Sequence, residues 1–189
     1  MGASWFQTSE IAPREYKCSY CGGKEVGSNK GYYTMDASQG IWLCPRGHPT
    51  FFDSAGNQYP SPVFGRSVDN IPAKEVNDLY EEARRCMSVQ AYTSAVLACR
   101  KLLMNIAVEK GDTPGKYFIE YVDYLAKKNY VPPGGEEWVD HIRDKGNEAT
   151  HEIQLMNKED AETLIEFTEM LLKFVYEFPA KVKSRHPSS

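Results

Sequence analysis

Three cysteines and one histidine near the N-terminus have the types and the spacing of metal ligands. Cys18 and Cys21 form a Cys-x-x-Cys turn followed by two glycines, and Cys44 and His48 bracket a second turn, Cys-Pro-Arg-Gly-His. Structural zinc sites are tetrahedral and take thiolate and imidazole ligands from two such turns. The glycines let backbone amides approach the sulfurs. We therefore predict a closed Cys3His site that holds structural zinc and has no open position for catalysis.

The alternative is that these residues are ordinary reduced cysteines in a loop-rich segment. Residues 1–58 show little apolar core of their own, and a module of that kind needs a metal to stay folded. The chain has five cysteines, an odd number, and its first residues lack the basic start and apolar core of a signal peptide. We expect a cytoplasmic protein without structural disulfides, in which Cys86 and Cys99 are small core residues of helices.

A second set of polar residues lies in the C-terminal half of the chain. Arg143, Asn147 and His151 are spaced by four residues, so a continuous helix places all three on one face. A guanidinium can hold a phosphate with two hydrogen bonds, and an imidazole can transfer a proton near neutral pH. The three are therefore candidate catalytic residues acting on a phosphate. The alternative is that His151 braces a helix–helix contact through hydrogen bonds.

The two halves of the chain predict different elements around these residues. Residues 1–58 combine the two turns with short aromatic segments of strand character at 32–35 and 40–43, which together describe a zinc ribbon. A proline-rich stretch over 59–70 predicts an extended linker. Beyond it, Ala, Leu, Glu and Lys recur with helical spacing. Five helices are predicted: one that begins after Ile71-Pro72, then 91–110, 115–128, 136–152 and 158–178.

Short connections between these amphipathic helices predict an antiparallel bundle over residues 71–180, followed by a tail over 181–189. The predicted fold class is thus mainly α, an antiparallel helical bundle preceded by a small β-rich zinc ribbon. Three aromatic residues beside the second turn have two interpretations: they stack on nucleic-acid bases, or they cover the ribbon and dock it onto the bundle. These are Trp42, Phe51 and Phe52.

The charge balance excludes some classes of partner. The chain has 189 residues with 22 basic and 26 acidic side chains, a net charge of −4, and a pI near 5.6. An acidic balance argues against a protein that coats duplex DNA, because that affinity comes mainly from neutralising phosphates. No apolar run approaches the roughly 20 residues that a membrane-spanning helix requires, so no membrane partner is expected.

Four segments carry a resemblance to a known family: 82–86 (EARRC), 92–96 (YTSAV), 99–103 (CRKLL) and 146–152 (GNEATHE). They resemble the prokaryotic family called domain of unknown function 4145 over roughly residues 70 to 178, and the Cys-rich head is similar to the zinc ribbon often attached to it. That family looks like a branch of the HEPN superfamily of helical bundles, which commonly dimerise. Several HEPN members are metal-independent ribonucleases in defence systems, and others are binding modules. The resemblance implies an HEPN-like bundle and a homodimer.

The HEPN ribonuclease motif places an arginine directly before a polar residue, with a histidine a few positions later. Here Asn147 matches the polar residue and His151 the histidine, but Gly146 stands at the arginine position. The resemblance therefore implies two functions. One is an RNA- or protein-binding, dimerising component, for example of prokaryotic defence. The alternative is a metal-independent endoribonuclease in which His151 is the general acid or base, Arg143 holds the phosphate and Asn147 orients the reacting groups. The glycine, the closed metal site and the acidic bundle favour the first.

Overall fold

The computed structural model describes residues 5–131, 135, 138–140, 142 and 155–185. The chain divides into two compact units, which are described one at a time below. The sheet unit comprises Met1–Phe64 with Arg85–Gln90, and the helical unit comprises Gly65–Arg84 with Ala91–Ser189. Across the described part of the chain, no helix has both the length and the apolar character needed to cross a membrane.

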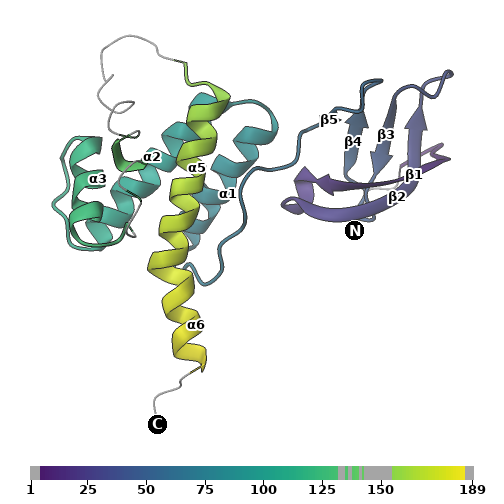
Figure 1. The fold of residues 1–189 in the computed structure, drawn as a ribbon. Helices are drawn as coiled ribbons and strands as arrows, with labels where there is room; N and C mark the ends of the chain where they lie inside the picture. The colour runs from purple at the N-terminus through teal and green to yellow at the C-terminus, as the bar shows by residue number, and fades with distance from the viewer. Residues whose placement is uncertain (1–4, 132–134, 136–137, 141, 143–154, 186–189) are drawn as a thin grey trace. The chain divides into compact units, whose positions relative to one another are not determined.

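The sheet unit is a five-stranded antiparallel sheet whose strands pair in chain order (Figure 1). β1 and β2 form a long, bent hairpin, and a bulge interrupts their register between Glu10 and Arg14. Bulges of this kind bend a strand and increase its twist. The strands are β1 Ser9–Cys18, β2 Lys24–Tyr33, β3 Gly40–Leu43, β4 Pro49–Phe52 and β5 Gln58–Tyr59.

The alternation of side chains along β3 and β4 places one set of residues in a small core. Trp42 and Phe52 are buried against each other with their rings edge to face, 5.3 Å apart between centroids. Gly31 of β2 is required where β2 and β3 meet, because a Cβ atom there would lie 1.8 Å from the carbonyl oxygen of Ile41. Seven buried residues form the core cluster: Ile11, Tyr16, Cys18, Cys21, Trp42, Cys44 and Phe52. Leu43 and Val63 are also buried in this unit.

The helical unit has a larger apolar core. In it α2 packs against both α3 and α5 (Figure 1). Its fully buried side chains include Tyr80, Leu102, Leu103, Ile106, Leu125, Ile165, Phe167, Leu171 and Leu172. The helices are α1 Lys74–Ser88, α2 Tyr92–Glu109, α3 Phe118–Lys127 and α5 Lys158–Leu172, which continues through a π-helical turn, Lys173–Glu177, into α6 Phe178–Arg185.

The segment that leads into α1 is held by hydrogen bonds within the helical unit. The buried guanidinium of Arg84 donates to the carbonyl oxygen of Gly65 and to Oγ of Ser67, both at 2.9 Å. The Glu169 carboxylate accepts from the backbone N–H of Arg66 at 2.7 Å. Because side chains of two helices bind this segment's backbone, residues 65–67 follow a fixed path along the unit.

The predicted fold class, mainly α with an HEPN-like bundle, is wrong. The chain begins with a five-stranded antiparallel sheet and continues with helices, and 48% of the described residues are helical while 18% lie in strands. The prediction found strand character at 32–35 and 40–43 but missed β1, β4, β5 and most of β2. Gly27, Ser28 and Asn29 give β2 no apolar alternation, and β1 contains a proline and a bulge. Pairing with neighbouring strands, rather than local propensity, makes these segments strands.

Candidate metal centre

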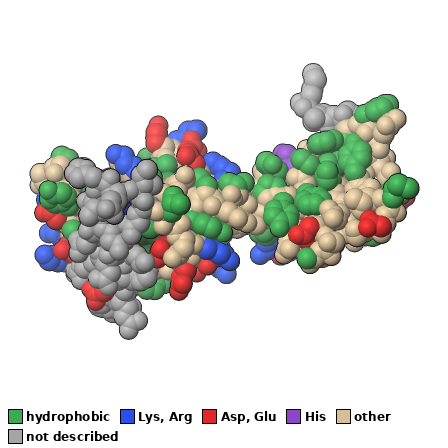
Figure 2. All heavy atoms as spheres, turned by 90° about the horizontal axis from the view of Figure 1, so that it is seen from above, with side chains coloured by type: hydrophobic (Ala, Val, Ile, Leu, Met, Phe, Trp, Pro, Cys, Tyr) green, Lys and Arg blue, Asp and Glu red, His purple; other side chains and the backbone are tan. Residues whose placement is uncertain are grey.

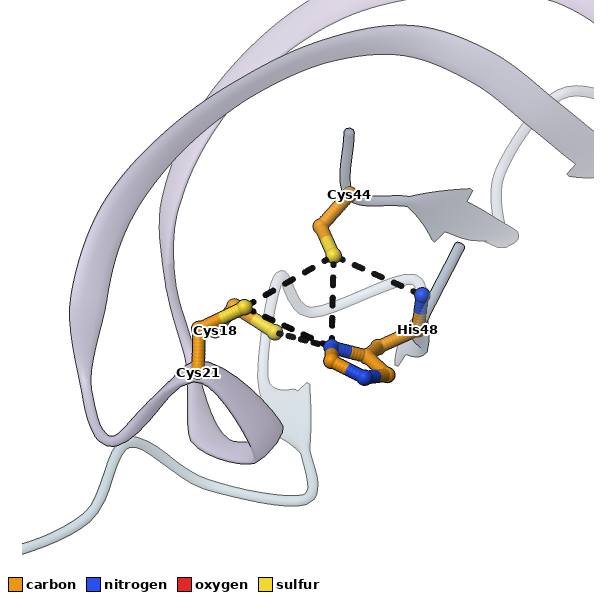
Figure 3. Close-up of side chains that lie close together, drawn as sticks. All are labelled: Cys18, Cys21, Cys44 and His48. Atoms are coloured by element: carbon orange, nitrogen blue, oxygen red, sulfur yellow. Dashed lines mark hydrogen bonds between the residues drawn. The ribbon is translucent and has the colours of Figure 1, made fainter. Parts of the chain in front are cut away.

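Two tight turns of the sheet unit carry the four predicted ligands. Cys18 is the last residue of β1, and Cys21 ends the 3-10 turn Ser19–Cys21 that follows it. Cys44 comes directly after β3, and His48 directly before β4. The sheet pairing brings the ends of these strands together, so two turns that lie more than twenty residues apart in the chain face one another (Figure 3).

Backbone hydrogen bonds shape both turns. In the first, Gly22 adopts a left-handed conformation at φ 71°, and the N–H of Gly23 donates to the carbonyl oxygen of Cys18 at 3.0 Å. In the second, the N–H of Gly47 donates to the carbonyl oxygen of Cys44 at 2.7 Å, and Gly47 itself has φ 83°. Positive φ angles are available to glycine at little cost, so these glycines let the chain reverse within a few residues of each ligand pair.

The four ligand atoms converge on one point. Nδ1 of His48 lies 3.4 Å from Sγ of Cys21, 3.5 Å from Sγ of Cys44 and 3.9 Å from Sγ of Cys18 (Figure 3). The sulfurs of Cys21 and Cys44 are 3.9 Å apart, and all four atoms lie within 4.8 Å of one another. Zinc–sulfur and zinc–nitrogen bonds of about 2.3 and 2.0 Å in a tetrahedron put the ligand atoms about 3.5–3.8 Å apart. The arrangement therefore has the size of a metal site.

The electrostatics of the thiols also fit a cation. Burial, together with the neighbouring thiols, raises the pKa of Cys18 to about 12. Burial also raises the pKa of Cys44, but hydrogen bonds from the backbone N–H groups of His48 and Arg46 outweigh it and lower that pKa below its ordinary value. Three thiolates this close repel one another unless a positive charge lies between them. A divalent metal would supply that charge and bind all three in ionised form.

The described part of the chain holds one group of His, Cys, Asp and Glu residues close enough together to bind a metal, and it is this one. The predicted catalytic residues Arg143, Asn147 and His151 lie outside the described residues, as does Gly146. Their roles remain predictions.

The aromatic residues near the second turn do not act as one group. Trp42 and Phe52 belong to the core of the sheet unit, whereas Phe51 is half-buried and, as the neighbour of Phe52 along β4, points to the opposite face of the sheet. The sequence analysis did not predict that Phe51 lies on the opposite face from Trp42 and Phe52. The signal was present in the alternation of Ile41 with Trp42 and of Phe51 with Phe52, but it has meaning only once both segments are known to be strands.

Comparison with known families concerns mainly the helical part of the chain. A family model described as "Domain of unknown function (DUF4145)" matches residues 81–186, which leaves the metal centre outside the match. No curated protein and no solved structure matches the chain. Since the family model covers more than half of its length, the chain belongs to the DUF4145 family.

Proposed function

We propose that the sheet unit is a zinc-binding module and that the protein is a non-catalytic binding component built from this module and a DUF4145 domain. The observation that carries the proposal is the convergence of Cys18, Cys21, Cys44 and His48 within 4.8 Å. Three thiolates and one imidazole are a donor set typical of structural zinc, whereas Mg²⁺ and Ca²⁺ prefer oxygen ligands. Four protein ligands complete a tetrahedral shell and leave no position for a substrate or a reactive water.

The role of the ion is to hold the unit folded. Three of the seven residues in the buried core cluster are the proposed cysteine ligands, which leaves four other side chains in that cluster. Structural zinc contributes an apparent binding free energy of about 10–16 kcal/mol at neutral pH in small modules. That is enough to compensate for the small size of this unit's apolar core.

Metal content tests the proposal directly. Protein purified from zinc-supplemented cells is expected to contain one zinc ion per chain by mass spectrometry of the metals. Cys18→Ser and Cys44→Ser should each lower that content strongly, while Cys86→Ser, a matched change of a cysteine outside the cluster, should not. Native protein with well under one zinc per chain, or with iron in its place, would contradict the proposal.

The predicted homodimer and the alternative endoribonuclease are tested separately. Light scattering during gel filtration gives the mass in solution, and a dimer is the expected result. For the nuclease, end-labelled single-stranded RNA is incubated with the native protein and with His151→Ala in the presence of EDTA. A non-catalytic component leaves the RNA intact in both samples. Cleavage by the native protein alone would replace the proposed role with the metal-independent nuclease.

A further inference from the structure

The sheet unit carries a row of large side chains on the face opposite its core. Tyr32, Ile41, Phe51 and Tyr59 are paired directly across β2, β3, β4 and β5. Directly paired residues of antiparallel strands place their side chains on the same face. The rings of Phe51 and Tyr59 lie 6.0 Å apart, and Trp5 extends the row at the other end, 6.3 Å from the ring of Tyr32.

This face is not part of the core. Trp5 is 40% exposed and Tyr59 is 44% exposed, while the three residues between them are half-buried. An antiparallel sheet with one solvated face normally carries polar residues there. Figure 2 shows hydrophobic side chains gathered on the surface of the sheet unit with few charged ones among them. An exposed apolar group of this kind indicates an interaction surface.

A groove of about 580 Å³ adjoins the row at Trp5 and supplies positive charge. Lys30 and Arg46 line it, together with the polar residues Ser28 and Asn29. The indole N–H of Trp5 donates to the carbonyl oxygen of Gly47 at 2.7 Å, which anchors the ring at the groove's edge. None of the residues described as lining the groove is acidic. The Glu10 carboxylate lies beside it, where it accepts a hydrogen bond from Nδ2 of Asn29 at 3.1 Å.

We propose that this face binds single-stranded nucleic acid, with bases stacked on the exposed aromatic rings and phosphates held by Lys30 and Arg46. The row crosses four strands, about 14 Å at the usual strand spacing. Four-stranded sheets that bind RNA stack two or three bases on such a surface. The proposal rests on the proposed function, because the sheet needs its metal to fold.

Charge favours nucleic acid over an apolar protein partner. Among the described residues, neither Lys30 nor Arg46 forms an ion pair, so both are available to a phosphate. An apolar protein partner would offer no negative group to Lys30 or Arg46. With two phosphates neutralised, log Kobs should fall with log salt at a slope of about −1.4.

Fluorescence anisotropy with the full-length, zinc-loaded protein tests the proposal. The probes are a short labelled oligouridylate, the matching oligothymidylate, and an abasic oligonucleotide of the same length. We expect binding to the oligouridylate and much weaker binding to the abasic strand, which has phosphates but no bases to stack. The oligothymidylate shows which kind of single strand the face prefers. Affinity equal to that for the oligouridylate indicates that any single strand binds, and weaker affinity indicates a preference for RNA. Tyr59→Ala and Trp5→Ala should each weaken binding about 5- to 150-fold.

Tyr33→Ala is the matched control, because Tyr33 is 55% exposed, lies next to Tyr32 on β2 and therefore faces the other way. It should bind like the native protein. Arg46→Gln should lower the magnitude of the salt slope by about 0.7. Zinc content is measured on every sample, so that a protein without zinc contradicts the proposed function and not this inference. Zinc-loaded native protein that binds no strand, binds the abasic strand equally well, or is unaffected by Tyr59→Ala and Trp5→Ala would overturn it.

Discussion

The sheet unit and the helical unit are stabilised in different ways. The helical unit buries a continuous set of large side chains, among them Phe167 and Leu103, that need no outside ligand. The core of the sheet unit is a cluster of seven buried residues, and three of them are the cysteines of the proposed metal centre. A short β-rich segment can therefore fold around a small apolar core when one ion joins its turns, whereas the helices are stabilised by the packing of their apolar side chains. Changes to the metal, to buried side chains and to the open face of the sheet test that contrast.

Removal of the metal should unfold one unit and spare the other. Zinc binding of about 10–16 kcal/mol exceeds the stability of most small domains, so chelation should abolish the sheet unit's fold. Hydrogen exchange read by mass spectrometry should show loss of protection over β1 to β4 and little change over α2 and α5. If the strands stay protected after zinc has been shown to be absent, the apolar core alone holds the sheet and the contrast between the units fails.

The helical unit should be most sensitive to its buried arginine. Arg84 is 2% exposed and pairs with Glu81 while it holds the backbone of Gly65. Arg84→Ala leaves that carboxylate without its partner and should cost about 3–5 kcal/mol of unfolding free energy, measured by urea denaturation followed by circular dichroism. Arg85→Ala, at the exposed neighbouring position, serves as the control and should change stability by no more than about 0.5 kcal/mol. Equal effects of the two substitutions would contradict the structural role of Arg84.

A smaller, pH-dependent effect is expected where α2 meets the π-helical turn between α5 and α6. The hydroxyl of Tyr176 donates to the carboxylate of Glu109. Burial raises the pKa of Glu109, but hydrogen bonds from Lys110 and Tyr176 outweigh burial and hold that pKa below its ordinary value. A carboxyl group with a lowered pKa stabilises the folded state above its unfolded pKa, and this contribution is lost as pH falls through the folded value.

Tyr176→Phe should therefore cost about 1 kcal/mol at neutral pH, a modest amount because the Glu109 side chain is 39% exposed and partly screened by water. The cost should shrink as the pH is lowered through the range in which Glu109 takes up a proton. Thermal unfolding of both proteins between neutral and acidic pH measures it. A cost that stays constant over that range would show that the lost hydrogen bond does not depend on the charge of Glu109.

The smallest effect on stability is expected on the open face of the sheet. Tyr59→Ala should change the unfolding free energy by no more than about 0.5 kcal/mol, because the ring is 44% exposed and lies outside the core. Differential scanning calorimetry of Tyr59→Ala and Tyr33→Ala should give nearly the same transition as the native protein. A large loss of unfolding free energy with Tyr59→Ala would mean that the aromatic row is a second core. The sheet unit would then depend on side-chain packing much as the helical unit does.

Much of the helical part was predictable because helical periodicity is local. The predicted helix over 91–110 is present as Tyr92–Glu109, and the helix predicted over 158–178 begins at Lys158 as expected. Its continuation to Arg185 was not predicted, since α6 buries none of its residues and so lacks an apolar stripe. The strands were harder to predict, because β1 and β2 owe their conformation to each other and not to their own composition.

The composition of the proposed metal centre was predictable from the residues alone, because Cys18 and Cys21, like Cys44 and His48, are brought together by turns of a few residues whose chemistry is local. The folded chain was needed to show that Nδ1 of His48 faces the sulfurs. It was also needed to show that residues as distant as Tyr32 and Tyr59 share one face of a sheet. The physical reason is strand register: a shift of one residue moves every side chain of a strand to the opposite face, and register depends on contacts between segments far apart in the chain.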